Sequence, residues 1–248
     1  IKLIGVSHLD GHLYSNWLRQ SYESYEAKPR KIEFPVVALI VSGGHTTLLL
    51  MKDIIHYEIL GETRDDAAGE CFDKTARILG LPYPGGPAIA AQAAKFETRN
   101  SKFEIKLPRP MMYTKDYDFS FSGLKTAVLY NYQARPKKER ESKAYVQAMA
   151  AEIQQAIIDV LMKKTMRAAK EFSAKSIILG GGVAANESLR TAIKKECSRL
   201  NIAPFIPPPN LATDNGAMIA LAGYFVYAAN SYEKNLEKIE ANPNLRLA

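Results

Sequence analysis

Two histidines, His8 and His12, stand four residues apart near the start of the chain. On an α-helix this spacing places both imidazoles on one face, about one turn apart. Such a pair, completed by a carboxylate from elsewhere in the chain, is a common way to hold a divalent metal ion. Asp214, just before a predicted helix, is a candidate carboxylate, although its position also suits a helix N-cap. Leu9 follows His8 where zincin peptidases have glutamate, which disfavours that class.

Two glycine-rich turns follow predicted buried strands. In Ser42-Gly43-Gly44-His45, glycine lets the backbone approach a phosphate that free N–H groups can bind, but an ordinary hairpin turn explains the same residues. Gly180-Gly181-Gly182 stands between a strand and a helix, which is typical of nucleotide sites. The spacing is not G-x-G-x-x-G, so a Rossmann dehydrogenase is not indicated. The second turn therefore indicates ligand binding, and the first leaves both interpretations open.

The elements that must position these residues alternate between strand and helix periodicity, which favours the α/β class. Asp73 falls inside one expected helix, where a carboxylate faces solvent or hydrogen-bonds a ligand hydroxyl. A linker is expected at 26–35, a loop at 84–87 and a charged hinge at 136–143. Helices are expected at 7–27, 66–80, 88–96, 122–132, 144–172, 187–200 and 216–229, and strands at 36–41, 46–51, 54–60, 176–179 and 203–206.

The composition is that of a globular protein, with 47% apolar and 24% charged residues among 248. The net charge of +7 favours an anionic partner such as nucleic acid, although basic clusters at 137–143 and 163–170 also suit solvated helix faces. Cys71 and Cys197 form no C-x-x-C pair, so a reducing cytoplasm is expected. No apolar run is long enough for a membrane span. Because the first residue is Ile1, we expect a chain cut from something longer.

Seven stretches, taken together and in this order, resemble the TsaD family, which forms N6-threonylcarbamoyladenosine beside the anticodon of tRNAs reading codons that begin with A. Their form is similar to that of bacterial members. The stretches are His8-Leu-Asp-Gly-His12, Val41-Ser-Gly-Gly-His-Thr46, Asp65-Asp-Ala-Ala-Gly-Glu-Cys-Phe-Asp-Lys-Thr75, Tyr83-Pro-Gly-Gly-Pro87, Phe119-Ser-Phe-Ser-Gly-Leu-Lys-Thr126, Gly180-Gly-Gly-Val-Ala-Ala-Asn186 and Ala212-Thr-Asp-Asn-Gly216.

The resemblance implies an actin-like ATPase fold (ASKHA, ribonuclease H-like) whose first subdomain is truncated. Residues 1–30 would be the remnant of that subdomain, 36–215 the second subdomain, and 216–248 a C-terminal helix and tail packing back on the first. By resemblance, one iron or zinc ion would be held by His8, His12 and Asp214. The substrate threonylcarbamoyl-AMP would contact Ile40, Val41, Ser42, Gly43 and Gly44, with its ribose and adenine held by Asp73, Gly86 and Asn186.

The resemblance also implies partners: the tRNA anticodon arm, a TsaB-like paralogue and a TsaE-like ATPase. The family has glutamate between the two histidines where this chain has Asp10, which is a candidate for proton handling. It also has a longer N-terminal region before His8, which leaves the activity of these residues alone open. Two other functions stay open: a metallopeptidase, and a catalytically silent actin-like scaffold or regulatory subunit.

Overall fold

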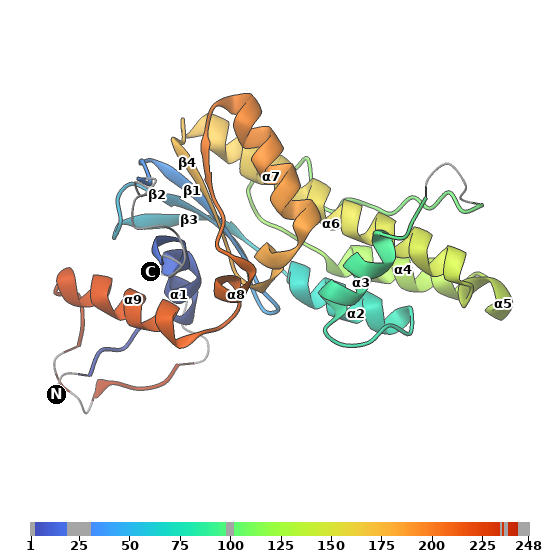
Figure 1. Ribbon diagram of the computed structural model, residues 1–248, viewed down its shortest axis with the longest axis horizontal. Helices are drawn as coiled ribbons and strands as arrows, with labels where there is room; N and C mark the ends of the chain where they lie inside the picture. Colours follow the sequence, from blue (N-terminus) through green and yellow to red (C-terminus); the bar gives the residue numbers. More distant parts are fainter. Residues whose placement is uncertain (1–2, 19–30, 98–101, 234, 236–237, 243–248) are drawn as a thin grey trace.

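The computed structural model describes residues 3–18, 31–97, 102–233, 235 and 238–242 (Figure 1). Its centre is a five-stranded mixed sheet in the order β3-β2-β1-β4-β5. β1 pairs antiparallel with β2 and parallel with β4, while β3 and β5 form the two edges. The strands are β1 (Val36–Val41), β2 (Thr46–Met51), β3 (Tyr57–Glu62), β4 (Ser176–Gly180) and β5 (Ala203–Phe205).

Both faces of the sheet are covered by helices. Val37 and Leu39 of β1 belong to the core shared with α6 (Lys143–Glu171) and α7 (Glu187–Leu200). Their neighbours along the strand, Val36, Ala38 and Ile40, belong to the opposite core. That core is shared with α1 (His8–Tyr14) and α9 (Gly216–Ala228), which lie on the other side of the sheet in Figure 1. Alternation along one strand therefore builds two apolar layers, and the α/β class predicted from the sequence is confirmed.

A helical arm extends from the sheet along α6 (Figure 1). We use this name for α2 to α5, of which α2, α3 and α4 share one core with α6. With 29 residues, α6 is about 43 Å long. Ser142 caps its first turn by accepting a hydrogen bond from the Tyr145 amide. The helices of the arm are α2 (Ala68–Ile78), α3 (Gly85–Ala93), α4 (Ser122–Gln133) and α5 (Lys137–Arg140).

The first helix is shorter than its sequence predicts. α1 ends at Tyr14 and continues as a 3-10 turn, η1 (Ser15–Trp17), before Leu18 becomes extended. The Ser15 hydroxyl donates to the His12 carbonyl at 2.7 Å, one of the local side-chain bonds with which serine competes against helix propagation. The remainder of the predicted helix, and the first half of the expected linker at 26–35, lie outside the described residues.

Three further boundaries differ from expectation. α3 begins at Gly85, inside the predicted 84–87 loop, because the Asp73 carboxylate accepts the Gly85 amide hydrogen and satisfies the helix end. β3 begins at Tyr57 rather than 54, since the Asp53 carboxylate accepts hydrogen bonds from the Ile55 and His56 amides and holds a turn. The charged hinge contains the short α5, and a further short helix, α8 (Pro209–Ala212), follows the run of prolines.

The other predicted helices and strands are present with ends shifted by at most a few residues. The three-part domain division remains a prediction. α1 and α9 pack against each other and share one core with β1. Within the described ranges, no helix combines the length and the apolar character needed to cross a bilayer.

Candidate functional site

One open cavity of about 570 Å³ lies where the β1–β2 turn meets the start of α1 and the segment before α9. With Gly182, which follows β4, it brings together residues from four separate parts of the chain. Its lining consists of His8, His12, Ser42, Gly43, Gly44, His45, Gly182, Thr213 and Asp214.

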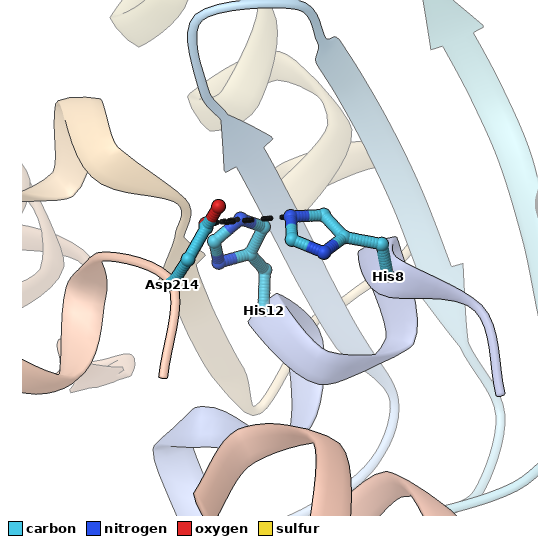
Figure 2. Close-up of side chains that lie close together, drawn as sticks. All are labelled: His8, His12 and Asp214. Atoms are coloured by element: carbon cyan, nitrogen blue, oxygen red, sulfur yellow. Dashed lines mark ion pairs between the residues drawn. The ribbon is translucent and has the colours of Figure 1, made fainter. Parts of the chain in front are cut away.

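The two histidines and the aspartate that the sequence offered as candidate metal ligands lie together in this cavity (Figure 2). The Asp214 Oδ1 atom lies 3.3 Å from His8 Nε2 and 3.2 Å from His12 Nε2. The candidate ligand atoms of all three residues lie within 4.8 Å of one another. The His12 side chain is only 1% exposed, whereas those of His8 and Asp214 are 51% and 73% exposed. One of the three candidate ligands is thus fixed in the core, and the other two are open to solvent.

This geometry fits a divalent metal ion. Two atoms that each bind a tetrahedral ion at about 2.1 Å lie roughly 3.4 Å apart, close to the two distances from Asp214 to the histidines. Two imidazoles and a carboxylate are donors that suit zinc or iron. Burial, and then the neighbouring His8, lower the pKa of His12 against the opposing effect of Asp214, which favours the neutral imidazole that binds metals. The other ring nitrogen of His12, Nδ1, is buried without a hydrogen-bond partner among the described residues.

The Ser42–His45 turn forms the opposite wall as a tight loop. The Ser42 amide donates to the His45 carbonyl at 2.8 Å, and the Ser42 hydroxyl accepts from the His45 amide at 3.1 Å. In the described part of the chain, no hydrogen bond engages the amides of Gly43 and Gly44, and a Cβ at either would meet nothing within 4 Å. The loop therefore presents two free N–H donors beside open space, as an anion site requires.

The N-terminus of α2 supports this loop from behind. The Ala68 amide donates to the Thr46 hydroxyl at 2.9 Å. A Cβ at Gly69 would lie 2.4 Å from the Ser42 carbonyl oxygen, so only glycine allows the helix to come this close. The position of the loop is therefore set by α2.

The three consecutive glycines have different roles. A Cβ at Gly180 would lie 2.7 Å from the His12 carbonyl, and Gly181 has φ +84° with the Val41 carbonyl 2.3 Å from its Cβ position. These two glycines permit close packing of α1 and β1 against β4. Gly182 has no atom within 4 Å of its Cβ position and lines the cavity. Of these three glycines, Gly182 is therefore the one placed to contact a bound ligand.

Several residues proposed for the substrate lie outside the cavity lining. Ile40 and Val41 are fully buried in β1. Asp73 and Gly86 lie near each other, where α2 meets the start of α3, and Gly86 faces open space. Asn186 caps α7 by accepting from the Leu189 amide at 3.0 Å. A substrate longer than the cavity would have to extend along α2 to meet Asp73 and Gly86.

Asp10 also points away from the cavity. Its Oδ1 atom accepts a hydrogen bond from the Tyr57 hydroxyl at 2.6 Å. Burial raises the pKa of the Asp10 carboxyl, and the hydrogen bond from Tyr57 only partly opposes this. Because Asp10 lies two residues from each histidine, it faces the side of α1 opposite to theirs.

Three lining residues, His45, Gly182 and Thr213, were not singled out individually from the sequence. His45 directly follows the glycine pair in the turn, and that position was the available signal. Desolvation by the surrounding residues, and then the neighbouring His8, lower the pKa of the His45 imidazole.

The N-cap of α9 is Asn215, which accepts from the Met218 amide at 2.9 Å. Asp214 is therefore free of the capping role considered for it.

The matching family model and the similar proteins all carry the same name. A family model described as TsaD, tRNA N6-adenosine threonylcarbamoyltransferase, matches residues 1–221. A protein of that name from Syntrophomonas wolfei is 46% identical over 93% of this chain and 63% of its own length. Another from Thermosipho africanus is 45% identical over 99% of this chain and 68% of its own length. A third, from Anoxybacillus flavithermus, is 45% identical over 100% of this chain and 67% of its own length.

The chain thus spans about two thirds of the length of these relatives. Among solved structures, the crystal structure of T. kodakarensis HypF is similar over 73% of this chain and 22% of its own, with a TM-score of 0.48 and 18% identity. That likeness is too slight to assign a fold or a function.

Proposed function

Because this chain belongs to the TsaD family of tRNA N6-adenosine threonylcarbamoyltransferases, we propose that it transfers the threonylcarbamoyl group of threonylcarbamoyl-AMP to tRNA. The acceptor is N6 of the adenosine 3′-adjacent to the anticodon in tRNAs that read codons beginning with A. The observation that carries the proposal is the convergence of His8, His12 and Asp214 with two open glycine turns in one cavity. A silent scaffold would have no need for such a convergence.

The reaction is an acyl transfer. The exocyclic nitrogen forms a bond to the carbamoyl carbon, the bond from that carbon to the phosphate oxygen breaks, and AMP leaves with the electron pair. The amine loses one proton. Asp10, the acceptor suggested by the sequence, faces Tyr57, so His45 in the cavity wall is the better-placed base.

His8, His12 and Asp214 would hold one divalent ion, iron or zinc, whose chemistry is Lewis-acid polarisation of the threonylcarbamoyl carbonyl. The free amides of Gly43 and Gly44 would donate hydrogen bonds to charge that develops on the reacting group or the phosphate. The ribose and adenine would extend toward Asp73, Gly86 and Asn186. Ile40 and Val41 would contribute through their backbone, since their side chains are buried.

Three finer assignments belong to the same proposal. The fold is of the actin-like ASKHA type, which agrees with the mixed sheet in the order β3-β2-β1-β4-β5 covered by helices on both faces. The enzyme works in the cytoplasm, where its tRNA substrate is found. Its partners are a TsaB-like paralogue and a TsaE-like ATPase.

The test is transfer of labelled threonylcarbamate from its adenylate to unmodified tRNA, with both partners supplied. We expect label in the tRNA with the wild-type chain and none above background with His8→Ala. His56→Ala removes an exposed imidazole that pairs with Asp53 in a turn, and should transfer normally. Full transfer by a His8→Ala variant shown to be free of metal would refute the metal-assisted reaction.

A further inference from the structure

The direction in which His8 and His12 point depends on the rotation of α1 about its own axis. Each residue of a helix turns by about 100°, so Asp10 lies roughly 200° from either histidine. A contact that holds the Asp10 side chain on one side of α1 therefore aims the imidazoles at the other. A rotation of even a few tens of degrees would carry both ring nitrogens away from Asp214.

Such a contact exists on β3. The Tyr57 hydroxyl donates to Asp10 Oδ1 at 2.6 Å, at a site where burial raises the pKa of both groups. A second hydrogen bond, from the Tyr14 hydroxyl to the Ile54 carbonyl at 2.8 Å, joins the next turn of α1 to the segment before β3. Both bonds run from α1 to the same edge of the sheet. Because hydrogen bonds are directional, they resist rotation.

The remaining contacts of α1 fix its distance from its neighbours. A Cβ at Gly11 would lie 3.0 Å from the side chain of Ile219, so α1 and α9 touch closely. A Cβ at Gly180 would lie 2.7 Å from the His12 carbonyl, so α1 is equally close to β4. The Asn16 amide donates to the Leu179 carbonyl at 3.0 Å, but from the 3-10 turn beyond the end of α1. Apart from the contacts of the two histidines with Asp214, the bond from Tyr57 to Asp10 is the one side-chain hydrogen bond that joins the histidine-bearing turn of α1 to another element among the described residues.

We propose that Tyr57 is a positioning residue for the metal centre, and that its hydrogen bond to Asp10 sets the rotation of α1 at which His8 and His12 face Asp214. The inference rests on the metal site of the proposed function. It assigns Asp10 a role in the geometry of the site in place of proton transfer. It also makes the edge strand β3 part of the site, although none of its residues lines the cavity.

The experiment is Tyr57→Phe, which removes one oxygen atom and keeps the ring. Zn²⁺ affinity of the purified chain is measured by competition with a chromophoric chelator, and Co²⁺ absorption spectra report the ligand geometry. We expect Zn²⁺ to bind about 10- to 100-fold more weakly, the range associated with loss of a partner that orients a ligand, and the Co²⁺ spectrum to change. Wild-type affinity and spectrum in Tyr57→Phe would overturn the inference.

Two matched variants separate positioning from general loss of stability. Tyr145→Phe removes a hydroxyl that bonds Asn131 at 3.1 Å in the helical arm, and should leave Zn²⁺ affinity unchanged. Asp10→Asn keeps an oxygen acceptor for Tyr57 and should retain affinity, while Asp10→Ala should lose it. An equal loss in Tyr145→Phe, or equal affinities in the two Asp10 variants, would contradict positioning. The Asp10 pair also carries the test if Tyr57→Phe fails to fold. If the wild-type chain binds no Zn²⁺, the proposed metal site itself fails.

Discussion

At the scale of single residues, the carboxylate of Asp65 joins two segments 55 positions apart in the chain. It accepts hydrogen bonds from the hydroxyls of Ser120 and Ser122, both at 2.6 Å, and from the amides of Phe121 and Ser122 at the start of α4. Two of the family stretches are thus tied together by one side chain. Burial raises the pKa of this carboxyl, but the four hydrogen bonds outweigh it and leave the pKa below its ordinary value.

A carboxyl whose pKa is lower in the folded than in the unfolded chain stabilises the fold above its unfolded pKa of about 3.9. That stabilisation is lost as pH falls through the folded pKa. Asp65→Asn keeps one acceptor oxygen but puts an NH₂ donor where the other oxygen accepts from two hydroxyls. We expect this change to lower the free energy of unfolding by about 1 kcal/mol at pH 7, the size of one lost hydrogen bond, and by progressively less below pH 4. Urea unfolding at a series of pH values measures this.

Glu141→Gln, which neutralises an exposed carboxylate on the same arm, is the charge-matched control and should change little at any pH. If the difference between wild type and Asp65→Asn stayed constant from pH 7 to pH 3, Asp65 would have no role as an ionised cap.

Some residues of the candidate site could be predicted from the sequence alone, and others could not. The spacing of His8 and His12 was sufficient to place both on one helix face, because that is a property of the helix alone. Asp214 was one candidate carboxylate, and only the family resemblance selected it as the third ligand, since no local pattern shows which distant carboxylate meets a given helix. Asp10 was assigned to proton handling from its position in the motif. Its true direction depends on which side of α1 meets β3, and that is decided by packing.

At the scale of elements, α2 and the Ser42–His45 loop are pressed together through Gly69. An alanine there would place a Cβ 2.4 Å from the Ser42 carbonyl oxygen, a backbone atom that cannot move without moving the loop. We therefore expect Gly69→Ala to weaken binding of an adenylate analogue at least tenfold. Isothermal calorimetry with a non-hydrolysable threonylcarbamoyl-AMP analogue provides the measurement.

Gly123→Ala is the matched control, because it lies in the first turn of α4 and its Cβ would meet only the Pro110 side chain, at 3.8 Å. That variant should bind normally and gain up to about 1 kcal/mol of stability from helix propensity. Gly69→Ala with wild-type affinity would mean that the loop is held by something other than α2.

Elements were easier to predict than their ends. The wholly apolar run of β1 and the long stripe of α6 require burial whatever their neighbours, so local sequence defines them. The start of α3 depends on Asp73, twelve positions earlier, which accepts the Gly85 amide hydrogen. The prolines and glycines at 84–87 predicted a loop when taken alone. The carboxylate from the preceding helix turns the same residues into the start of a helix.

At the scale of the whole molecule, the net charge of +7 favours an anionic partner, and the tip of the helical arm in Figure 1 is one candidate surface for it. α5 lies at the end of the helical arm, at the opposite end of α6 from the sheet. It carries Lys137 and Lys138, both exposed, and Arg140. α6 is about 43 Å long, with cations at its tip and the candidate catalytic cavity near the sheet at its other end. An RNA stem lying along the arm would place its backbone against these cations and its loop at the cavity.

We expect the double charge reversal Lys137→Glu and Lys138→Glu to weaken binding of unmodified tRNA and to flatten its dependence on salt. For each phosphate that the variant no longer neutralises, the slope of log affinity against log salt falls by about one, because fewer counterions are released. Fluorescence anisotropy with labelled tRNA at several salt concentrations gives both quantities. Lys194→Glu and Lys195→Glu make the same change in total charge on the exposed face of α7, so they report what net charge alone does. An equal effect from both pairs would assign tRNA attraction to the overall charge, and no effect from the α5 pair would place the tRNA on another surface.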